Sequence, residues 1–422
     1  PRFTLFPYTT LFRSPYSGTA IGFEFRNQGS EFVLDESLSR FSDSISLPFL
    51  NDFGQRGERD VDAYFAEVNL PLAGEASNLP GVRALDLSLA ARRERFSDFG
   101  DATVKRATLR WQPLDSDVLA VRASYSESFY APELFDLLPQ GDSNLQTNAD
   151  PLIVDAGGNP LRYDMTTISG GNPNLDPTTG EYMNVGFILK PSFLPGFSLT
   201  ADVWKLDQKD AFVYPLAQAV INGDAPGTVV RDPVALPGEP IGRITTVTNR
   251  VANAATRNVA GIDLNIAYSI ATDVGQWSFA SYNTYTSKFE YDNADGADTQ
   301  SGLGLLTIFG AVPRLRSNLV ISNEIGPWNF TVGTNYFGKV KNTFYQLDRI
   351  APYVTTDLTV TFDFAKSRFG MLDGTVIWLN VDNVLDEDLP FVAAIRTTGL
   401  PSDYSYADYV GQFVTMGFRT KF

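Results

Sequence analysis

The sequence has neither cysteine nor histidine in its 422 residues. Without cysteine there are no disulfides and no thiolate nucleophiles, and without histidine there is no imidazole base and none of the usual zinc, copper or haem ligand sets. These absences argue against most classes of enzyme. We therefore expect a protein that is not an enzyme, with no catalytic residue, no cofactor and no bound metal.

Basic charge and long apolar runs are scarce as well. The 33 Lys and Arg residues are outnumbered by 49 Asp and Glu residues, and the net charge of −16 disfavours a nucleic-acid partner. The mean hydropathy is −0.10 and no run of about 18 apolar residues occurs, which excludes membrane-spanning helices. Aromatic residues reach 13% of the chain. A membrane protein of this composition must be a β-barrel with aromatic girdles.

Alternation of apolar and polar residues is the main pattern present, and it recurs from Gly18 to Phe422. In the stretch from Ile262 to Ile270, every second residue is apolar and the residues between them are mostly polar. Such a strand has one face for lipid and one for the lumen of an antiparallel transmembrane β-barrel. We expect about fourteen strands, at approximately 18–26, 61–71, 84–95, 103–112, 118–127, 180–190, 197–208, 257–270, 277–289, 314–323, 328–338, 353–364, 374–382 and 407–422.

The alternation also predicts which way individual side chains face. The apolar, lipid-facing set is Leu264, Ile266, Phe330, Leu358, Val360 and Phe418. The interior set is Asp263, Asn265, Asn329, Asp357, Thr359 and Arg419. A two-sheet sandwich, such as a soluble adhesin, permits the same alternation, so the connections between strands must decide.

Short and long connections alternate along the chain. Short turns are expected at 72–83, 113–117, 191–196, 271–276, 324–327 and 365–373. The others are mostly longer, at 27–60, 128–179, 209–256, 290–313, 339–352 and 383–406, with 96–102 as the short exception. Successive turns of an antiparallel sheet lie at opposite ends. Short periplasmic turns and long extracellular loops have this asymmetry in outer-membrane barrels. We therefore expect 128–179 and 209–256 at one end, opposite the carboxylate of Phe422.

Two motifs bracket the longest loop: Ser128–Leu134, SFYAPEL, and Asn172–Pro177, NPNLDP, with Glu181 shortly after it. They resemble the SFxAPxLxEL and NPxLxPExxxxxE segments of the TonB-dependent receptor family. The resemblance covers roughly Gly18 to Phe422. Further matches follow in the family's order at Asn258–Asp263, Pro313–Leu315, Val381–Glu387 and Gly411–Phe413.

This resemblance implies an outer-membrane receptor that takes up a scarce nutrient, such as a ferric siderophore, cobalamin or a glycan, with energy delivered through TonB. The implied partners are outer-membrane lipid and lipopolysaccharide, the TonB complex and a small nutrient ligand. The implied location is the bacterial cell outer membrane. A passive porin is the alternative, because it needs the same alternation without a plug. The resemblance assigns no ligand-binding residue.

Family members have a 22-stranded barrel with a plugged lumen. Residues 15–422 resemble the C-terminal portion, with about eight strands, the plug and the TonB-binding segment expected upstream. Thr4–Ser14, TLFPYTTLFRS, resembles a translated sequencing adapter, so we set residues 1–14 apart. We expect Gly18–Arg26 either to pair with Tyr406–Phe422, closing a smaller barrel, or to remain an open edge. Neither form has the plug, so neither is expected to transport.

A few residues invite a functional interpretation. Arg92, Arg110 and Arg122 fall on polar faces of neighbouring strands and suit a plug or an anionic ligand, although charge balance in the lumen is the simpler interpretation. Tyr163, Tyr345 and Tyr404 are candidate ligand contacts by their loop positions alone.

Two other patterns are set aside. The acidic stretch from Asp292 to Asp298 suggests a hard-cation site, but it misses the EF-hand spacing, and a solvated loop is the preferred interpretation. The stretch from Gly333 to Val340 nearly spells a phosphate-binding P-loop. Val340 replaces the required Ser or Thr, and the stretch lies within a predicted strand, so we reject a nucleotide site.

Overall fold

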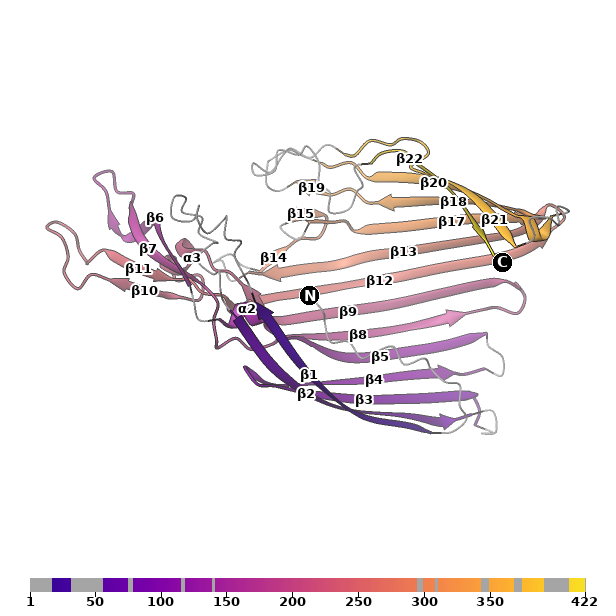
Figure 1. Cartoon of the computed structure of the whole chain (residues 1–422), viewed down its shortest axis with the longest axis horizontal. Helices are drawn as coiled ribbons and strands as arrows, with labels where there is room; N and C mark the ends of the chain where they lie inside the picture. Colours follow the sequence, from indigo (N-terminus) through magenta and orange to yellow (C-terminus); the bar gives the residue numbers. More distant parts are fainter. Residues whose placement is uncertain are drawn as a thin grey trace.

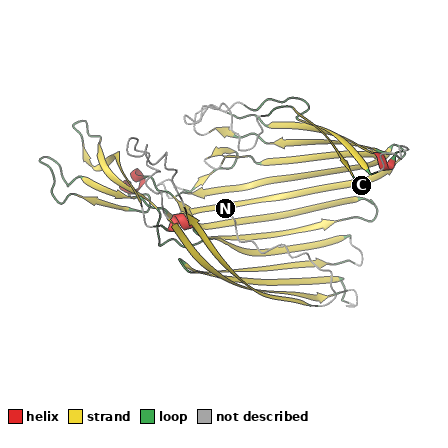
Figure 2. Cartoon of the chain, viewed as in Figure 1, coloured by secondary structure: helices red, strands yellow, loops and turns green. Residues whose placement is uncertain are grey.

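The computed structural model describes ten stretches of the chain. They are residues 17–31, 56–74, 79–114, 118–138, 141–293, 299–307, 310–342, 349–367, 374–390 and 410–421. Most of these residues belong to strands, and the helices are short (Figure 2). Within the described stretches, no helix approaches the length and apolarity needed to cross a membrane. Residues 1–14 lie outside them, so their separate origin stays a prediction.

One antiparallel sheet organises the molecule, and it contains all fourteen strands that the sequence predicts (Figure 1). Hydrogen-bonded neighbours follow one another in chain order, and the short β14 (Gln300–Ser301) adds to β13. The strands are β1 (Gly18–Glu31), β2 (Arg56–Ala73), β3 (Ala84–Phe96), β4 (Gly100–Gln112), β5 (Leu119–Tyr130), β8 (Thr178–Leu189), β9 (Phe197–Val213), β12 (Ala252–Thr272), β13 (Gly275–Asp292), β17 (Leu315–Ile325), β18 (Trp328–Phe337), β20 (Tyr353–Asp363), β21 (Thr375–Asp382) and β22 (Phe413–Thr420).

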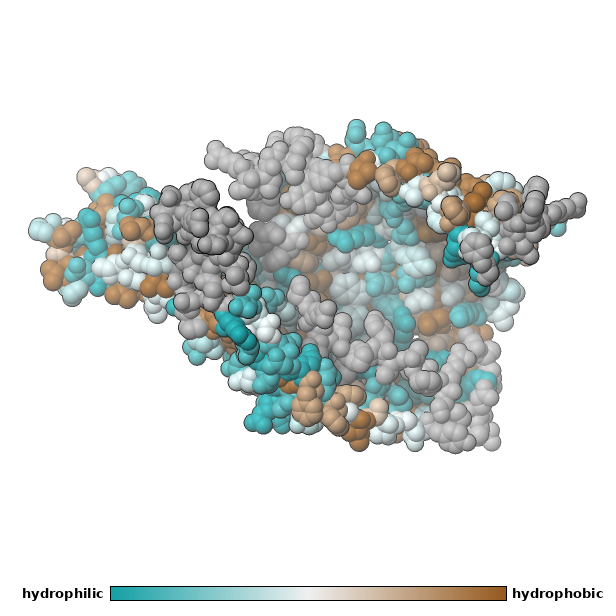
Figure 3. Space-filling model, viewed as in Figure 1, coloured by the Kyte–Doolittle hydropathy of each residue, from teal (hydrophilic) through white to brown (hydrophobic). Residues whose placement is uncertain are grey.

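Side-chain alternation gives the sheet two chemically different faces. Residues directly opposite each other in a ladder share a face, and Phe330 lies opposite Val360. On the other face, Thr284 donates to Asp263 at 2.8 Å. Figure 3 looks into the hollow of the curved sheet, whose wall is largely hydrophilic or intermediate. The ladder confirms the outward set of Leu264, Ile266, Phe330, Leu358, Val360 and Phe418 and the inward set of Asp263, Asn265, Asn329, Asp357, Thr359 and Arg419.

Aromatic side chains on the outward face lie at two levels. Tyr64 and Tyr285 lie toward the end with the long loops, and they are 54% and 44% exposed. Trp111 and Trp328 lie toward the end with the short turns, and they are 37% and 43% exposed. Two aromatic levels with an apolar band between them are typical of the two interfaces of a membrane barrel.

The end strands β1 and β22 each have a single neighbour among the described residues. β1 pairs with β2 from Gly18, opposite Asn69, to Glu31, opposite Arg56. β22 pairs with β21 alone in the described part of the chain. Of the two arrangements that the sequence allows, the structure shows the open sheet rather than closure of β1 onto β22.

Two long loops form a second, smaller sheet at the end opposite Thr420, as the connection lengths predict (Figure 1). β7 and β11 pair in parallel, with Thr166 beside Thr246, so both loops contribute to this sheet. We call it the loop body. Its elements are β6 (Gly141–Val154), β7 (Pro160–Gly170), α3 (Ala217–Asn222), β10 (Thr228–Arg231) and β11 (Ile244–Thr248), while α2 (Leu134–Leu137) precedes it. A three-stranded sheet of β15 (Leu305–Thr307), β16 (Gly310–Val312) and β19 (Lys341–Asn342) lies at the same end.

Glycine admits large aromatic rings on the inward face. Gly261 lies opposite Trp204, and a Cβ atom on Gly261 would meet the Trp204 ring at 2.6 Å and the Tyr285 carbonyl oxygen at 2.7 Å. At Gly333, in contrast, the nearest atom is 3.9 Å away, on Asp357. The first glycine is therefore required by packing, whereas the second leaves room for a methyl group.

We expect Gly261→Ala to destabilise the sheet by about 1–3 kcal/mol, because overpacking displaces the Trp204 ring or the backbone. The matched control is Gly333→Ala, which is expected to be neutral or slightly stabilising since it restricts the unfolded chain. Urea unfolding in detergent measures both variants. Equal effects of the two substitutions would contradict the assigned packing.

Candidate functional site

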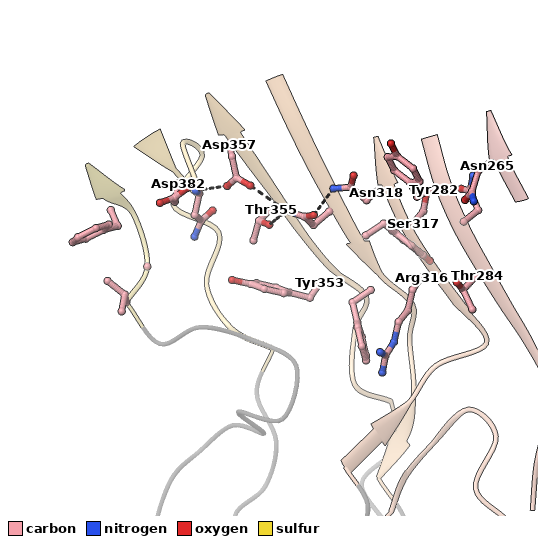
Figure 4. A pocket seen from close by; sticks show the side chains of 18 residues that line it. Asn265, Tyr282, Thr284, Arg316, Ser317, Asn318, Tyr353, Thr355, Asp357 and Asp382 are labelled. Carbon is pink, nitrogen blue, oxygen red and sulfur yellow. Dashed lines mark hydrogen bonds between the residues drawn. The ribbon is translucent and has the colours of Figure 1, made fainter. Parts of the chain in front are cut away.

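A pocket of 680 Å³ lies on the inward face, near the loop ends of β13 to β22 (Figure 4). Uncharged amide and hydroxyl groups dominate its wall, together with aromatic rings. Ligand pockets of this size commonly combine such rings with a few oriented polar groups. The inward-facing residues in its lining are Asn265, Tyr282, Thr284, Arg316, Asn318, Asn335, Phe337, Tyr353, Thr355, Asp357, Asp382 and Phe413.

Hydrogen bonds between neighbouring strands fix the orientation of the pocket's amides (Figure 4). Asn318 donates to Asn335 at 2.7 Å, and Asn335 donates to Asp357 at 3.1 Å. Asp357 also accepts from the backbone N–H of Asn383 at 2.8 Å. Because each group is held by the next, the wall presents preorganised donors and acceptors to the lumen.

Arg316 supplies the pocket with a positive charge. Its guanidinium lies 4.8 Å from the centre of the Phe337 ring, and its Nη2 makes one long contact, of 3.5 Å, with the Ala311 carbonyl oxygen. Among the described residues, Arg316 forms no ion pair. The cation is therefore free to bind an acceptor-rich or anionic group that enters the pocket.

A tight turn next to the pocket joins two of the motifs noted in the sequence. Asn383 has a φ of 49°, and its side chain accepts from the Glu387 N–H at 2.9 Å and donates to the Glu387 carbonyl at 3.0 Å. Asp386 accepts from the Gln412 N–H at 3.1 Å. The Val381–Glu387 and Gly411–Phe413 motifs therefore hold the end of β21 against the start of β22.

Side-chain hydrogen bonds of Asn172 and Asn253 also hold neighbouring segments together, at the point where the loop body joins the rim of the main sheet. The Asn172 amide donates to the Val251 carbonyl at 3.0 Å, which links the two long loops. The Asn253 amide donates to the carbonyls of Asp176, at 2.7 Å, and Asp210, at 2.8 Å. The NPNLDP motif thus has a structural role at the base of both loops, and its partner Asn253 was not predicted because it belongs to no sequence motif.

A buried ion pair joins the two loops inside the loop body. The Asp150 side chain is fully buried. It accepts hydrogen bonds from Nη1 and Nη2 of Arg231, at 2.7 and 2.9 Å, and from the Tyr163 hydroxyl at 2.6 Å. The Tyr163 oxygen accepts from the Ile244 N–H at 2.7 Å. Tyr163, a candidate ligand contact, is thus engaged within the loop body, while Tyr345 and Tyr404 lie outside the described residues.

The environment of this ion pair sets two pKa values. Burial raises the pKa of Asp150, but hydrogen bonds from Arg231 and Tyr163 outweigh it, and the pKa lies below its ordinary value of 3.8. Burial, reinforced by the hydrogen bond to Asp150, raises the pKa of Tyr163 to about 12. Both groups therefore keep their native charges across the neutral pH range.

The three arginines singled out in the sequence do face the interior. Arg110 lies directly opposite Arg122 in the ladder, whereas Arg92 lies opposite Val104, farther along the strands. Arg92 pairs with Glu24 at 2.8 Å and with Glu94 at 2.7 Å. Arg122 donates to Asp202 at 2.9 Å, and Arg110 reaches Asp86 at 3.4 Å. Each arginine has a carboxylate partner on the same face, which fits charge balance in the lumen.

The two patterns set aside earlier offer no site in the described residues. Gly333 to Phe337 belong to β18, so the P-loop-like stretch begins in a strand. Asp292 ends β13, and residues 294–298 lie outside the described chain. Where the structure is described, no three acidic, histidine or cysteine side chains gather into a metal-binding group.

We expect Arg231→Met to unfold the loop body, since it leaves Asp150 buried without its cation, at a cost of about 3–5 kcal/mol. Limited proteolysis should then cut residues 141–170 and 217–248 together. Arg162→Gln, which changes an exposed arginine of the same sheet, is the matched control and should leave both segments resistant. Cleavage of one segment alone in the Arg231 variant would contradict a shared body.

Acid should also unfold the loop body of the wild-type protein. The lowered pKa of Asp150 contributes stability that is present above its unfolded value of about 3.9 and is lost as the pH falls through its folded value. We expect protease resistance to persist at neutral pH and to fall below about pH 4, as measured with an acid-stable protease. Unchanged resistance at pH 2 would argue against the ion pair.

Comparison with known proteins gives one family and one fold. The family model described as "TonB dependent receptor-like, beta-barrel" matches residues 2–384. Among solved structures, the siderophore receptor PirA from Acinetobacter baumannii aligns with a TM-score of 0.61 at 13% identity, covering 96% of this chain and 52% of that one. A mutant ferric enterobactin receptor from Pseudomonas aeruginosa, in complex with enterobactin, aligns at 0.57 and 17% identity, covering 89% and 47%.

The FrpB iron transporter from Neisseria meningitidis is similar in the same way, with a TM-score of 0.56 at 13% identity over 96% of this chain and 52% of that one. The search of curated proteins found no match. The chain spans about half the length of these structures. At such low identities the structures indicate the fold, and the family model, which matches most of the chain, decides the family. The chain belongs to the TonB-dependent receptor β-barrel family.

Proposed function

We propose that the protein acts in TonB-dependent uptake of a scarce nutrient across the bacterial outer membrane, with a ferric siderophore as the favoured class over cobalamin or a glycan. The pocket on the inward face carries this proposal, because it lies near the loop end and combines oriented amides, aromatic rings and Arg316, which forms no ion pair in the described part of the chain. The family supports a receptor role. The proposed partners are the TonB complex, the small nutrient ligand and outer-membrane lipid.

The chemistry of the pocket favours an iron chelate within this range of nutrients. Ferric chelates present oxygen acceptors and often a net negative charge, which suit the Arg316 guanidinium and the amide donors of Asn318 and Asn335. The rings of Phe337 and Tyr353 provide flat contacts for an aromatic or planar ligand group. Two of the similar structures are a ferric enterobactin receptor and a siderophore receptor, which supports this choice.

Uptake of labelled iron tests the proposal. A host strain that lacks its own siderophore receptors would express the full-length receptor, with its plug and TonB-binding segment, and be offered catecholate, hydroxamate and hydroxycarboxylate ferric chelates. We expect saturable uptake of one class that disappears with an uncoupler or after deletion of TonB. Uptake that proceeds equally without energy would favour a passive porin and contradict the proposal.

Arg316→Gln should weaken binding of the transported chelate about ten- to a hundredfold, because it removes charge-assisted hydrogen bonds of about 1.5–3 kcal/mol. Arg110→Gln is the matched control, since that arginine faces the lumen near the opposite end and pairs with Asp86. Titration of ligand fluorescence against the purified receptor measures both. Equal losses in the two variants would exclude the pocket as the ligand site.

A further inference from the structure

The charges of the pocket lie at two separate places on its wall. Arg316 on β17 is the one cation in the described lining, and Asp357 on β20 and Asp382 on β21 are its two carboxylates. In Figure 4, the Tyr353 ring lies between these carboxylates and the Arg316 guanidinium. The pocket therefore has a basic side, an aromatic middle and an acidic side.

The register of β20 and β21 brings the two carboxylates together. The ladder pairs Leu358 with Val381, and Asp357 and Asp382 are the next residues of the two strands, on the inward face. Like charges at such neighbouring positions repel each other. Among the described residues, neither carboxylate has a cation as its partner. A positive group that enters the pocket would relieve this repulsion.

Neutral hydrogen-bond donors orient the two carboxylates. Asp357 uses both of its oxygens, one to accept from the Asn335 amide at 3.1 Å and one to accept from the Asn383 N–H at 2.8 Å. Asp382 accepts through Oδ1 from the Asn380 amide at 2.8 Å. Its Oδ2 atom has no hydrogen-bond partner in the part of the chain that the structure describes. This oxygen can accept a hydrogen bond from a ligand.

Open space and an aromatic ring adjoin the acidic side of the pocket. Gly333 lies opposite Asp357, and a Cβ atom placed on Gly333 would meet no atom closer than 3.9 Å. Phe413 lies opposite Asp382, lines the pocket and is 52% exposed. Carboxylates beside an aromatic ring suit a protonated amine, because the oxygens and the face of the ring both attract a cation.

We propose that Asp357 and Asp382 determine the specificity of the pocket by selecting a ferric chelate that carries a protonated amine. This inference rests on the proposed function and specifies its ligand further. Arg316 alone would favour an anionic chelate, but the described lining holds two negative charges against one positive charge. Arg316 then donates to oxygen atoms around the iron, while the carboxylates accept from the ammonium group at the other end of the ligand. An anionic tris-catecholate complex without an amine fits this arrangement poorly.

Two forms of one ligand test this assignment: the ferric complex of a linear trihydroxamate that ends in an amine, and the same complex with its amine acetylated. Both forms hold iron through the same oxygens, and they differ mainly in the positive charge. Isothermal titration of the full-length receptor in detergent should show about tenfold tighter binding of the amine form, since a charge-assisted hydrogen bond stabilises that form alone. Asp382→Asn should abolish this preference, and Asp382→Glu, which keeps the charge, should retain it.

The controls separate a role in specificity from a role in folding. Asp86→Asn changes an inward carboxylate near the turn end of β3 and should leave the preference unchanged. Arg316→Gln should weaken both forms equally and so preserve their ratio. An anionic ferric tris-catecholate should bind Asp382→Asn more tightly than it binds the wild type, a gain that a merely structural role of Asp382 would not produce. Unchanged thermal unfolding shows that each variant is folded.

Equal affinity of the wild type for the two forms would overturn the proposal. A preference that persists in Asp382→Asn, or that Asp86→Asn also abolishes, would overturn it as well. Energy-dependent uptake of another ferric chelate, with neither trihydroxamate form bound, would leave the proposed receptor role standing and overturn the selection for an amine.

Discussion

Backbone pairing in a hydrocarbon environment is the constraint from which the rest of this structure follows. Each unpaired N–H or C=O in lipid costs several kcal/mol, which favours strands that pair on both sides, as every strand of the main path between β1 and β22 does. β12, the longest strand, pairs with β9 along one edge and with β13 along the other. Once this ladder is fixed, the two-residue period decides the surroundings of every side chain. Ile262 then faces outward and Asp263 faces inward, because neighbouring residues of a strand point to opposite faces.

The inward face created in this way has two chemically different halves. On the strands from β1 to β9, carboxylates such as Glu94 and Asp202 pair with arginines, so that the charges there are mutually satisfied. At the loop ends of the strands from β13 to β22, amides and hydroxyls line the inward face, and Arg316 forms no ion pair among the described residues. The ion pairs of β1 to β9 stabilise the sheet, and the inward face of β13 to β22 is the surface suited to a ligand. The loop body above them is rigidified by its own buried ion pair between Asp150 and Arg231.

Local sequence was sufficient to predict the strands and their faces, because alternation such as that around Leu264 records directly which side meets lipid. It was also sufficient to identify the rim motifs, since Asn172 and Asn383 lie in short recognisable segments. The loop body was missed for a physical reason. Its parallel pairing of Thr166 with Thr246 and its Asp150–Arg231 ion pair join residues that are far apart in the chain. The pocket was missed likewise, because Arg316 and Phe337 meet only through the register of β17 and β18.

A nitroxide scan of one strand in membranes tests most directly whether the sheet has one face toward lipid and one toward the lumen. The chain has no cysteine, so a single cysteine introduced at each position from Ile262 to Ile266 can be labelled without a background. Collision with oxygen reports lipid, and collision with a water-soluble nickel chelate reports the lumen. We expect oxygen accessibility to peak at 262, 264 and 266 and nickel accessibility to peak at Asp263 and Asn265. Accessibilities that do not alternate, or that alternate with the opposite phase, would contradict a lipid-facing sheet with a polar interior.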